Sequence, residues 1–354
     1  MTMEAVVMEL TGKSGPSAIA RATRALGAPG PGQALVKVLA TGVSFAEVQM
    51  PRGRYPGQPA FPFVPGYDLV GTVVAVGANV NSALIGARVA ALTETGAWAT
   101  EVMLEARSLV PVPDGLDAGE AASLVVNGAT AWKMLHRVAR VQAGDTVVVH
   151  GAAGGVGALL VQLARVAGAR VIGTASARHL EAVRDLGAEA IDYRAADVAA
   201  EVRARAPGGV SAVFDHVGGA SLARSWEMLG PRGRLVAYGS ASTRDAQGSP
   251  WIPVLRMMAR MTLWNLLPGR RRAAFFDVWG RGNLGANRIL RPARYWAELA
   301  EDLGEVFALL GKGAIRAPIA ARLDLEEAAE ALRFHESGRV PGKVLLVPGM
   351  KAHA

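Results

Sequence analysis

Residues 146–157 read TVVVHGAAGGVG, and this stretch decides the fold. The valines of Thr146–His150 predict a buried strand, and the residues from Val156 to Ala167 have the apolar spacing of a helix. Glycines between a strand and a helix allow a tight turn and let backbone N–H groups approach a pyrophosphate at the helix N-terminus. The stretch therefore predicts a dinucleotide site built on Gly151, Gly154, Gly155 and Gly157.

The residues that follow repeat a strand–helix rhythm. Arg170–Thr174 predicts a second strand, and Ala177–Leu186 predicts a helix that Gly187 closes. Three more strands are expected at Ala190–Tyr193, Ala212–Asp215 and Arg234–Tyr238. Such alternation is typical of an α/β fold with a doubly wound parallel sheet.

The two ends of the chain have a different texture. Residues 1–125 are rich in Gly, Pro and Val, and the runs QALVKVLAT (33–41) and LVGTVVAV (69–76) predict strands of a compact β-rich domain. Near the C-terminus, two helices and a last strand are expected at Ala293–Leu310, Leu325–Ser337 and Lys343–Val347.

Composition excludes several classes of protein. With 354 residues and 51% hydrophobic residues, the chain has enough apolar material for two domains and is not disordered. It contains no cysteine, which excludes disulfides, thiolate nucleophiles and cysteine-ligated metals. No apolar run reaches the roughly 18 residues that a membrane helix needs. The first residues, MTMEAVVMELTGK, lack the pattern of a signal peptide, so a cytoplasmic protein is expected.

The net charge of +8 is concentrated in one segment. Residues 246–297 hold nine arginines and one acid, Asp277, together with four of the seven tryptophans. Three interpretations are open: a substrate mouth whose arginines bind an anionic tail, a surface for anionic membranes, or an extended loop at a dimer edge with a solvated basic rim. We favour the third. We expect no nucleic-acid partner, because aromatic residues alone do not make a reading surface.

The end of the second strand distinguishes NAD from NADP. An NAD site has an acidic residue there for the ribose 2′-hydroxyl, but the segment Gly173–His179 contains none. Ser176 can donate a hydrogen bond to a 2′-phosphate, and Arg178 can pair with it. The sequence therefore predicts NADPH, the alternative being that Arg178 is only solvated in the first turn of its helix.

Several motifs together resemble one known family. They are VPGYDLVGTVVAVG (64–77), NGATAWKML (127–135), HGAAGGVGALLVQLA (150–164), GRLVAYG (233–239) and the terminal GKVLLVP. The chain resembles the zinc-independent quinone oxidoreductase branch of the medium-chain dehydrogenase/reductase superfamily, and within it the vesicle amine transport protein homologues. The resemblance implies a GroES-like catalytic domain (1–125), a Rossmann NADP-binding domain (126–290) and a C-terminal return to the catalytic domain (291–354).

The chain departs from the zinc-dependent members of that superfamily. Where they have a cysteine followed by His, this chain has Ser44-Phe45-Ala46-Glu47, and where they have Gly-His-Glu it has Gly66-Tyr67-Asp68. Ser, Phe and Tyr do not provide a zinc ligand set, and the six histidines show no ligand spacing, so we expect no metal. Without a strong Lewis acid, the acceptor of a hydride must already be activated, as a quinone or the β-carbon of an enone or enoyl thioester is.

The resemblance also assigns roles to single residues. It implies that Tyr55 lies over the nicotinamide as a candidate proton donor, that Ser44 replaces a polar anchor that is commonly Asn, and that Tyr67 faces the catalytic cleft. The alternative for either tyrosine is a hydrophobic wall with its hydroxyl in water.

Further residues are implied to lie near the cofactor. Asn127 and Thr130 would contact the nicotinamide, Tyr193 would pack near the adenosine phosphate or merely cap its strand, and Lys343 would lie near the cofactor or be solvated. The cofactor set is Asn127, Thr130, Gly151, Ala153, Gly154, Gly155, Val156, Gly157, Ser176, Arg178, Tyr193, Gly239 and Lys343. His150 and His216, each at a strand end, could be proton relays, although a lone histidine is more often structural.

The sequence thus predicts an NADPH-dependent reductase of quinones or other conjugated carbonyls, acting as a homodimer on a small molecule. The rival hypotheses are an NADPH-binding scaffold or membrane-associated factor with little turnover, and a specialised enoyl reductase of a biosynthetic pathway.

Overall fold

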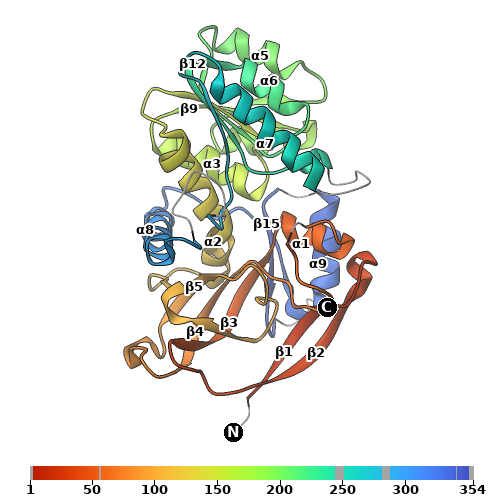
Figure 1. Cartoon of the computed structure of the whole chain (residues 1–354), viewed down its shortest axis with the longest axis vertical. Helices are drawn as coiled ribbons and strands as arrows, with labels where there is room; N and C mark the ends of the chain where they lie inside the picture. The colour runs from red at the N-terminus through yellow and green to blue at the C-terminus, as the bar shows by residue number, and fades with distance from the viewer. Residues whose placement is uncertain (1–2, 56, 244–250, 281–287, 340, 351–354) are drawn as a thin grey trace. The chain divides into compact units, whose positions relative to one another are not determined.

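The computed structural model describes residues 3–55, 57–243, 251–280, 288–339 and 341–350. The chain divides into two compact units (Figure 1). Unit 1 comprises Met1–Ala129 and Trp296–Ala354, and unit 2 comprises Thr130–Tyr295. The chain therefore leaves its first unit once and returns to it.

Unit 2 is built on a six-stranded sheet in which every recorded pairing is parallel. Its order is β10-β9-β8-β11-β12-β13. The strands are β8 (Thr146–His150), β9 (Arg170–Ala175), β10 (Glu189–Asp192), β11 (Val210–Asp215), β12 (Leu229–Ala237) and β13 (Arg272–Phe275). The order reverses at β8, and ligands of open α/β sheets bind at the carboxyl ends of the strands at such a switch point. The predicted doubly wound α/β fold is confirmed.

Helices connect these strands, as the sequence pattern predicted for the first two. They are α3 (Gly155–Val166), η6 (Ala177–His179), α4 (Leu180–Asp185), α5 (Val198–Arg205), α6 (Ser221–Glu227), η7 (Ala241–Thr243) and α7 (Trp251–Leu266). The helix α2 (Ala118–Trp132) was not predicted; it continues into the π-helical segment η5 (Lys133–Ala139) and carries the chain from unit 1 into unit 2.

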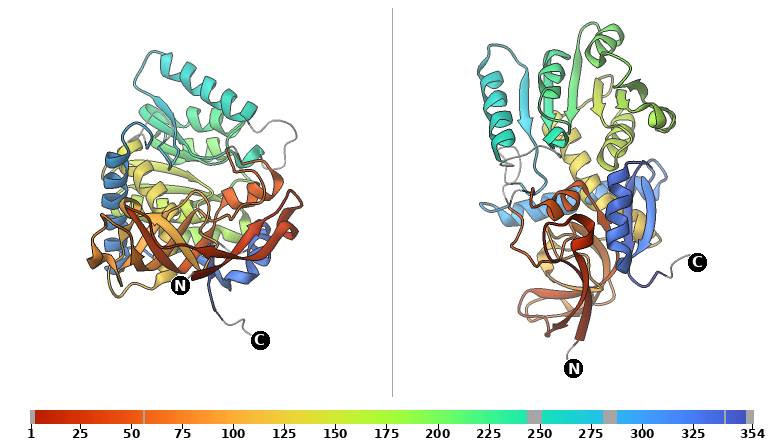
Figure 2. Two further views of the ribbon diagram at one scale, coloured as in Figure 1. Left: turned by 60° about the horizontal axis from the view of Figure 1, so that its bottom comes forward. Right: turned by 90° about the vertical axis from the view of Figure 1, so that its right-hand side faces the viewer.

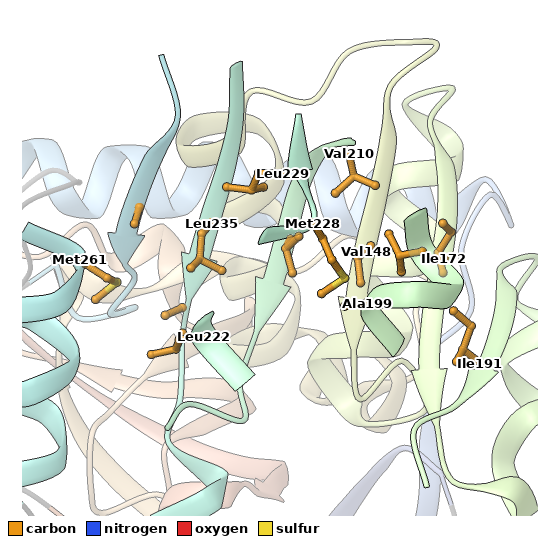
Figure 3. Packing of buried hydrophobic residues seen from close by; sticks show 14 of the residues in the cluster. Val148, Ile172, Ile191, Ala199, Val210, Leu222, Met228, Leu229, Leu235 and Met261 are labelled. Atoms are coloured by element: carbon orange, nitrogen blue, oxygen red, sulfur yellow. The ribbon is translucent and has the colours of Figure 1, made fainter. Parts of the chain in front are cut away.

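One apolar cluster holds the sheet and its helices together. Val148, Ile172 and Leu235 belong to it from β8, β9 and β12, and Met261 joins them from α7 (Figure 3). A β-branched or leucine side chain fully buried in this way contributes roughly 1.5–3 kcal/mol. The position of the strand ends, where the candidate site lies, depends on this packing.

The extended loop expected within residues 246–297 is wrong for residues 251–266. Residues 251–266 form α7, which lies beside the sixth strand β13 (Figure 2). Met257 and Met261 lie four residues apart and bury one face of α7, while the Trp264 ring stacks on Trp226 at 4.9 Å between centroids. Helical spacing of apolar residues therefore outweighs the basic composition. Residues 244–250 and 281–287 of this segment lie outside the described residues.

Unit 1 contains a hairpin and a larger sheet. The hairpin pairs β1 (Met3–Leu10) with β2 (Ile19–Leu26), and the sheet has the order β14-β15-β3-β4-β5-β7 with β6 paired to β3. Its strands are β3 (Gln33–Val43), β4 (Asp68–Val76), β5 (Arg88–Leu92), β6 (Glu101–Glu105), β7 (Val110–Pro111), β14 (Ile319–Asp324) and β15 (Lys343–Val347). The predicted β-rich domain is confirmed.

The C-terminal residues complete this sheet. Val344 of β15 pairs with Val43 of β3 in an antiparallel ladder, so strands from the two ends of the chain lie side by side. The remaining helices are η1 (Gly15–Ala18), α1 (Phe45–Gln49), η2 (Met50–Arg52), η3 (Ser82–Leu84), η4 (Ala106–Ser108), α8 (Pro292–Gly311), η8 (Leu325–Glu327) and α9 (Ala328–Ser337).

We predict that Leu235→Ala lowers the free energy of unfolding by about 2–5 kcal/mol, because it leaves a cavity in the cluster of unit 2. The matched control is Val166→Ala on α3, which should change the free energy of unfolding by no more than about 0.5 kcal/mol. Leu235 is 0% exposed and Val166 is 48% exposed. Urea-induced unfolding measures both, and equal effects would contradict the packing described for β12.

Candidate active site

The glycine turn after β8 brings two backbone segments into close approach. Gly151 has a φ of 65°, and a Cβ on it would lie 2.3 Å from Cε1 of His216. A Cβ on Gly157 would lie 2.1 Å from the carbonyl oxygen of Gly151. Only glycine fits at these two positions. The first turn of α3 thereby packs onto the loop, and its backbone N–H groups can bind a pyrophosphate.

The outer side of the same turn is open. Gly154, the N-cap of α3, is exposed, and Gly155 and Val156 are half-buried, whereas Ala153 is buried. A Cβ on Gly239, which follows β12, would lie 2.9 Å from the carbonyl oxygen of His216. The structure thus brings Gly239 to the same end of the sheet as the glycine turn. A dinucleotide fits this arrangement of backbone donors.

The ends of β9 and β10 bring together the residues expected near the ribose. Ser176 is buried at the N-cap of η6, and Arg178 is exposed. Tyr193 follows β10, and its N–H donates to the carbonyl of Ala175 at 3.2 Å. Its exposed ring lies 5.6 Å from the guanidinium of Arg194. Ser176, Arg178 and Tyr193 therefore lie on adjacent strand ends, as a site for the adenosine half of NADPH requires.

His150 is held by a buried polar network. Its Nδ1 lies 3.2 Å from Oγ1 of Thr174, and its Nε2 lies 3.1 Å from Oγ of Ser225. Ser225 in turn donates to Oδ2 of Asp215 at 2.7 Å, while Oδ1 of Asp215 accepts from the N–H of Val217 at 2.8 Å. Both imidazole nitrogens have partners, which favours the structural interpretation of His150 over a proton relay.

His216 has a different environment. Its Nδ1 is buried and has no hydrogen-bond partner among the described residues, and its ring lies 5.9 Å from that of Tyr238. Burial raises the pKa of Tyr238 above its ordinary value of 10.0, and the nearby Asp215 raises it further. His216 is therefore the histidine of this strand end with hydrogen-bonding capacity to spare.

Burial also lowers the pKa of both His150 and His216 below the ordinary 6.5. Because the folded state then binds fewer protons than the unfolded state, the stability that these groups contribute at neutral pH is lost as the pH falls below about 6.5.

In unit 1, Ser44 is the N-cap of α1 and forms a capping box with Glu47. The N–H of Ser44 donates to Oε2 of Glu47 at 2.9 Å, and its hydroxyl bonds the same oxygen. Glu47 is buried, and desolvation raises its pKa above 4.5. Sequence reasoning missed Glu47 as a site residue, although the Ser-x-x-Glu pattern of a capping box was visible.

Tyr55 and Tyr67 are brought together. Their rings meet edge to face with centroids 5.7 Å apart, Tyr67 being buried and Tyr55 half-buried. The backbone N–H of Tyr55 donates to Oε1 of Gln58 at 3.3 Å. Ser44, Tyr55 and Tyr67 all belong to unit 1.

The interpretation of Lys343 as a solvated lysine is wrong. Its side chain is buried in β15, and its ammonium forms a salt bridge with Asp68 at the start of β4. Asp68 also accepts from the N–H of Val126 at 3.1 Å. Asn127 and Thr130 are both buried on α2, Asn127 in unit 1 and Thr130 in unit 2.

The described residues hold neither a metal-binding cluster nor a membrane-spanning helix. They contain no group of three or more His, Cys, Asp or Glu side chains that could hold a metal ion. Within the same ranges, no helix has the length and apolar character to cross a membrane.

Comparison with known proteins identifies the family. Residues 30–114 match the family described as alcohol dehydrogenase GroES-like domain, and residues 186–346 match the one described as zinc-binding dehydrogenase. The chain is 35% identical over 331 residues to the human synaptic vesicle membrane protein VAT-1 homolog. This alignment covers 91% of the chain and 80% of the human protein. The chain belongs to the medium-chain dehydrogenase/reductase superfamily.

Similar solved structures indicate the branch of the superfamily. A mycobacterial protein complexed with NADPH is 30% identical, with a TM-score of 0.80, and the alignment covers 97% of this chain and 100% of that one. A mycobacterial quinone oxidoreductase is 31% identical, with a TM-score of 0.79 and the same coverage. The resemblance to the quinone oxidoreductase branch is confirmed.

We predict that Ser225→Ala lowers the free energy of unfolding by about 1–3 kcal/mol, because it leaves Nε2 of His150 and Oδ2 of Asp215 buried with one hydrogen bond fewer. Ser242→Ala, a control at an exposed position of unit 2, should change it by no more than about 0.5 kcal/mol. Chemical denaturation at pH 7.5 measures both, and an unchanged midpoint for Ser225→Ala would refute the network.

Proposed function

We propose that this chain is an NADPH-dependent oxidoreductase that reduces a quinone or another conjugated carbonyl, such as an enone or enoyl thioester, without a metal. The observation that carries the proposal is the glycine cradle between β8 and α3. A side chain on Gly151 or Gly157 would collide with the surrounding atoms, and the turn lies at the switch point of a parallel sheet.

Particular residues would hold the cofactor. The N–H groups at the start of α3 would bind the pyrophosphate, and Ser176 and Arg178 would bind the 2′-phosphate. By the family resemblance, Asn127 and Thr130 would orient the nicotinamide. When bound, NADPH supplies the hydride, and the protein's part is to position the acceptor and stabilise the charge that develops on its oxygen.

The two zinc-ligand positions support a metal-free reaction. Ser44 stands at one, and its hydroxyl is bonded to Glu47. Tyr67 stands at the other, and its ring packs against Tyr55. Neither side chain is a usual zinc ligand. An acceptor that is conjugated needs no strong Lewis acid, and we propose that it binds against Ser44, Tyr55 and Tyr67.

The exposed apolar residues of α7 are relevant to the oligomeric state of the protein. Ile252, Leu255, Leu263 and Leu266 are exposed on this helix, and β13 beside it is the last strand of the sheet in the described part of the chain. We propose that this edge forms a homodimer and that the protein is cytoplasmic. The rival, an NADPH-binding factor with little turnover that contacts membranes, draws on the same exposed leucines and on the nearby arginines.

Steady-state oxidation of NADPH with a panel of quinones and enones tests the proposal. We expect turnover with at least one class, equal rates with and without a chelator, and no stoichiometric zinc by elemental analysis. Tight NADPH binding without turnover on any acceptor would favour the rival, and loss of turnover on chelation would contradict the metal-free reaction.

The preference for NADPH gives a second prediction. Arg178→Ala should weaken NADPH binding roughly ten- to a hundredfold and leave NADH nearly unchanged, because one charge-assisted bond to the 2′-phosphate is worth on the order of 1.5–3 kcal/mol. Arg184→Ala, an exposed arginine of the neighbouring helix α4, is the matched control. Isothermal titration measures both cofactors; equal dissociation constants in the unmodified protein would end the claim.

A further inference from the structure

Unit 1 buries a cluster of charged side chains that the function proposed above does not use. Glu47 is 1% exposed, Asp68 is 0% exposed and Lys343 is 2% exposed. They come from three elements, α1, β4 and β15. If all three were ionised, the cluster would hold a net charge of −1 away from water, which is costly in a protein interior.

The hydrogen bonds of the cluster show which carboxyl would carry the surplus negative charge. The ammonium of Lys343 and the N–H of Val126 both bond Oδ2 of Asp68. The N–H and hydroxyl of Ser44 bond Oε2 of Glu47. The other oxygens, Oε1 of Glu47 and Oδ1 of Asp68, are buried without a partner among the described residues. Because Asp68 has the cation, Glu47 is the carboxyl that gains most from keeping a proton.

The charged and titratable groups around Glu47 agree with this assignment. Desolvation raises its pKa and so does Asp68, whereas the bonds from Ser44 and the charge of Lys343 act in the opposite direction without overcoming burial. On α9, burial and the charge of Lys343 lower the pKa of His335 to about 4, so this imidazole is neutral. With Glu47 protonated, the whole cluster is neutral.

Glu47 is more deeply buried than helix capping requires. The capping box of Asp324 and Glu327 has the same two capping bonds, with the N–H of Asp324 donating to Oε2 of Glu327 at 2.8 Å, but it leaves Glu327 half-buried. Capping therefore does not require a fully buried carboxyl. Ser44 is itself half-buried, so its hydroxyl links the interior carboxyl to the less buried side of α1.

We propose that Glu47 is a stored proton source and that it delivers its proton through the hydroxyl of Ser44 to the reduced acceptor. The inference deepens the proposed function and rests on it. Ser44 and Tyr67 mark the surface against which the acceptor was proposed to bind, and the hydroxyl of Ser44 is bonded to the buried acid.

The proton transfer balances as follows. Hydride addition to the β-carbon of an enone leaves an enolate, and the α-carbon takes the proton of the Ser44 hydroxyl as a new C–H bond forms. Oγ of Ser44 receives the proton of Oε2 of Glu47 at the same time, because a hydroxyl both donates and accepts. Glu47 is left as a carboxylate and is reprotonated from water before the next turnover.

Glu47→Gln is the decisive variant, because glutamine is neutral, has nearly the same volume and keeps an acceptor oxygen for Ser44, but has no proton to transfer. We expect it to slow enone reduction at least tenfold, while quinone reduction, which can take protons from water, stays within about threefold. In the unmodified protein the enone rate should fall as the pH rises through the raised pKa of Glu47. This fall should be absent in Glu47→Gln.

Four further variants separate the roles. Glu327→Gln makes the same change in the other capping box and should leave every rate unchanged. Ser44→Ala should resemble Glu47→Gln, and Ser44→Thr, which restores a hydroxyl, should recover most of the enone rate. If Tyr55→Phe slows enone reduction and Glu47→Gln does not, the tyrosine is the donor and the relay is overturned.

An infrared difference spectrum at pH 7, unmodified protein minus Glu47→Gln, reads the protonation state without any turnover. A protonated carboxyl band supports the proposal, and a carboxylate band overturns it. Enone reduction that is equal in rate and pH profile in the two proteins overturns the relay while leaving the reductase function standing. Failure of the unmodified protein to reduce any acceptor overturns both.

Discussion

The close approach of two backbone segments at the glycine turn is the constraint on which unit 2 depends. The carbonyl oxygen of Gly151 occupies the space where Gly157 would carry a Cβ, so α3 begins directly against the end of β8. This contact places the first N–H groups of α3, which have no acceptor within the helix, at the end of β8. Gly151 also leaves room for the ring of His216, which ties the end of β11 to the same turn.

A polar network beneath the turn keeps it in place. His150 bonds Thr174 on β9 and Ser225 on α6, and the hydroxyl of Ser225 donates to Asp215 on β11. Three strand ends are thereby linked by side chains that are all paired, and a fully paired buried network specifies one arrangement. The open side of the turn is left to backbone groups, which suits a ligand rich in phosphate oxygens.

Unit 1 is marked by charged side chains buried in its interior. Ser44 and Tyr67, which the family resemblance aligns with metal ligands of zinc-dependent members, make contacts to protein here, and the neighbouring Glu47 and Asp68 are interior carboxyls. Lys343 neutralises Asp68, and a glycine at position 42 admits its side chain, since a Cβ there would lie 1.9 Å from Cε of Lys343. The last strand therefore brings unit 1 a counter-charge as well as a ladder of hydrogen bonds.

The sequence by itself determined the α/β class, the glycine turn and most strands of unit 2, because alternation, apolar spacing and glycine positions are local properties of the chain. It failed for residues 251–266, where basic composition concealed the buried face of α7. Only the tertiary structure decided the state of Lys343, because its partner Asp68 lies 275 residues away. The same holds for Glu47: its capping pattern is visible in four residues, but its burial depends on strands from both ends of the chain.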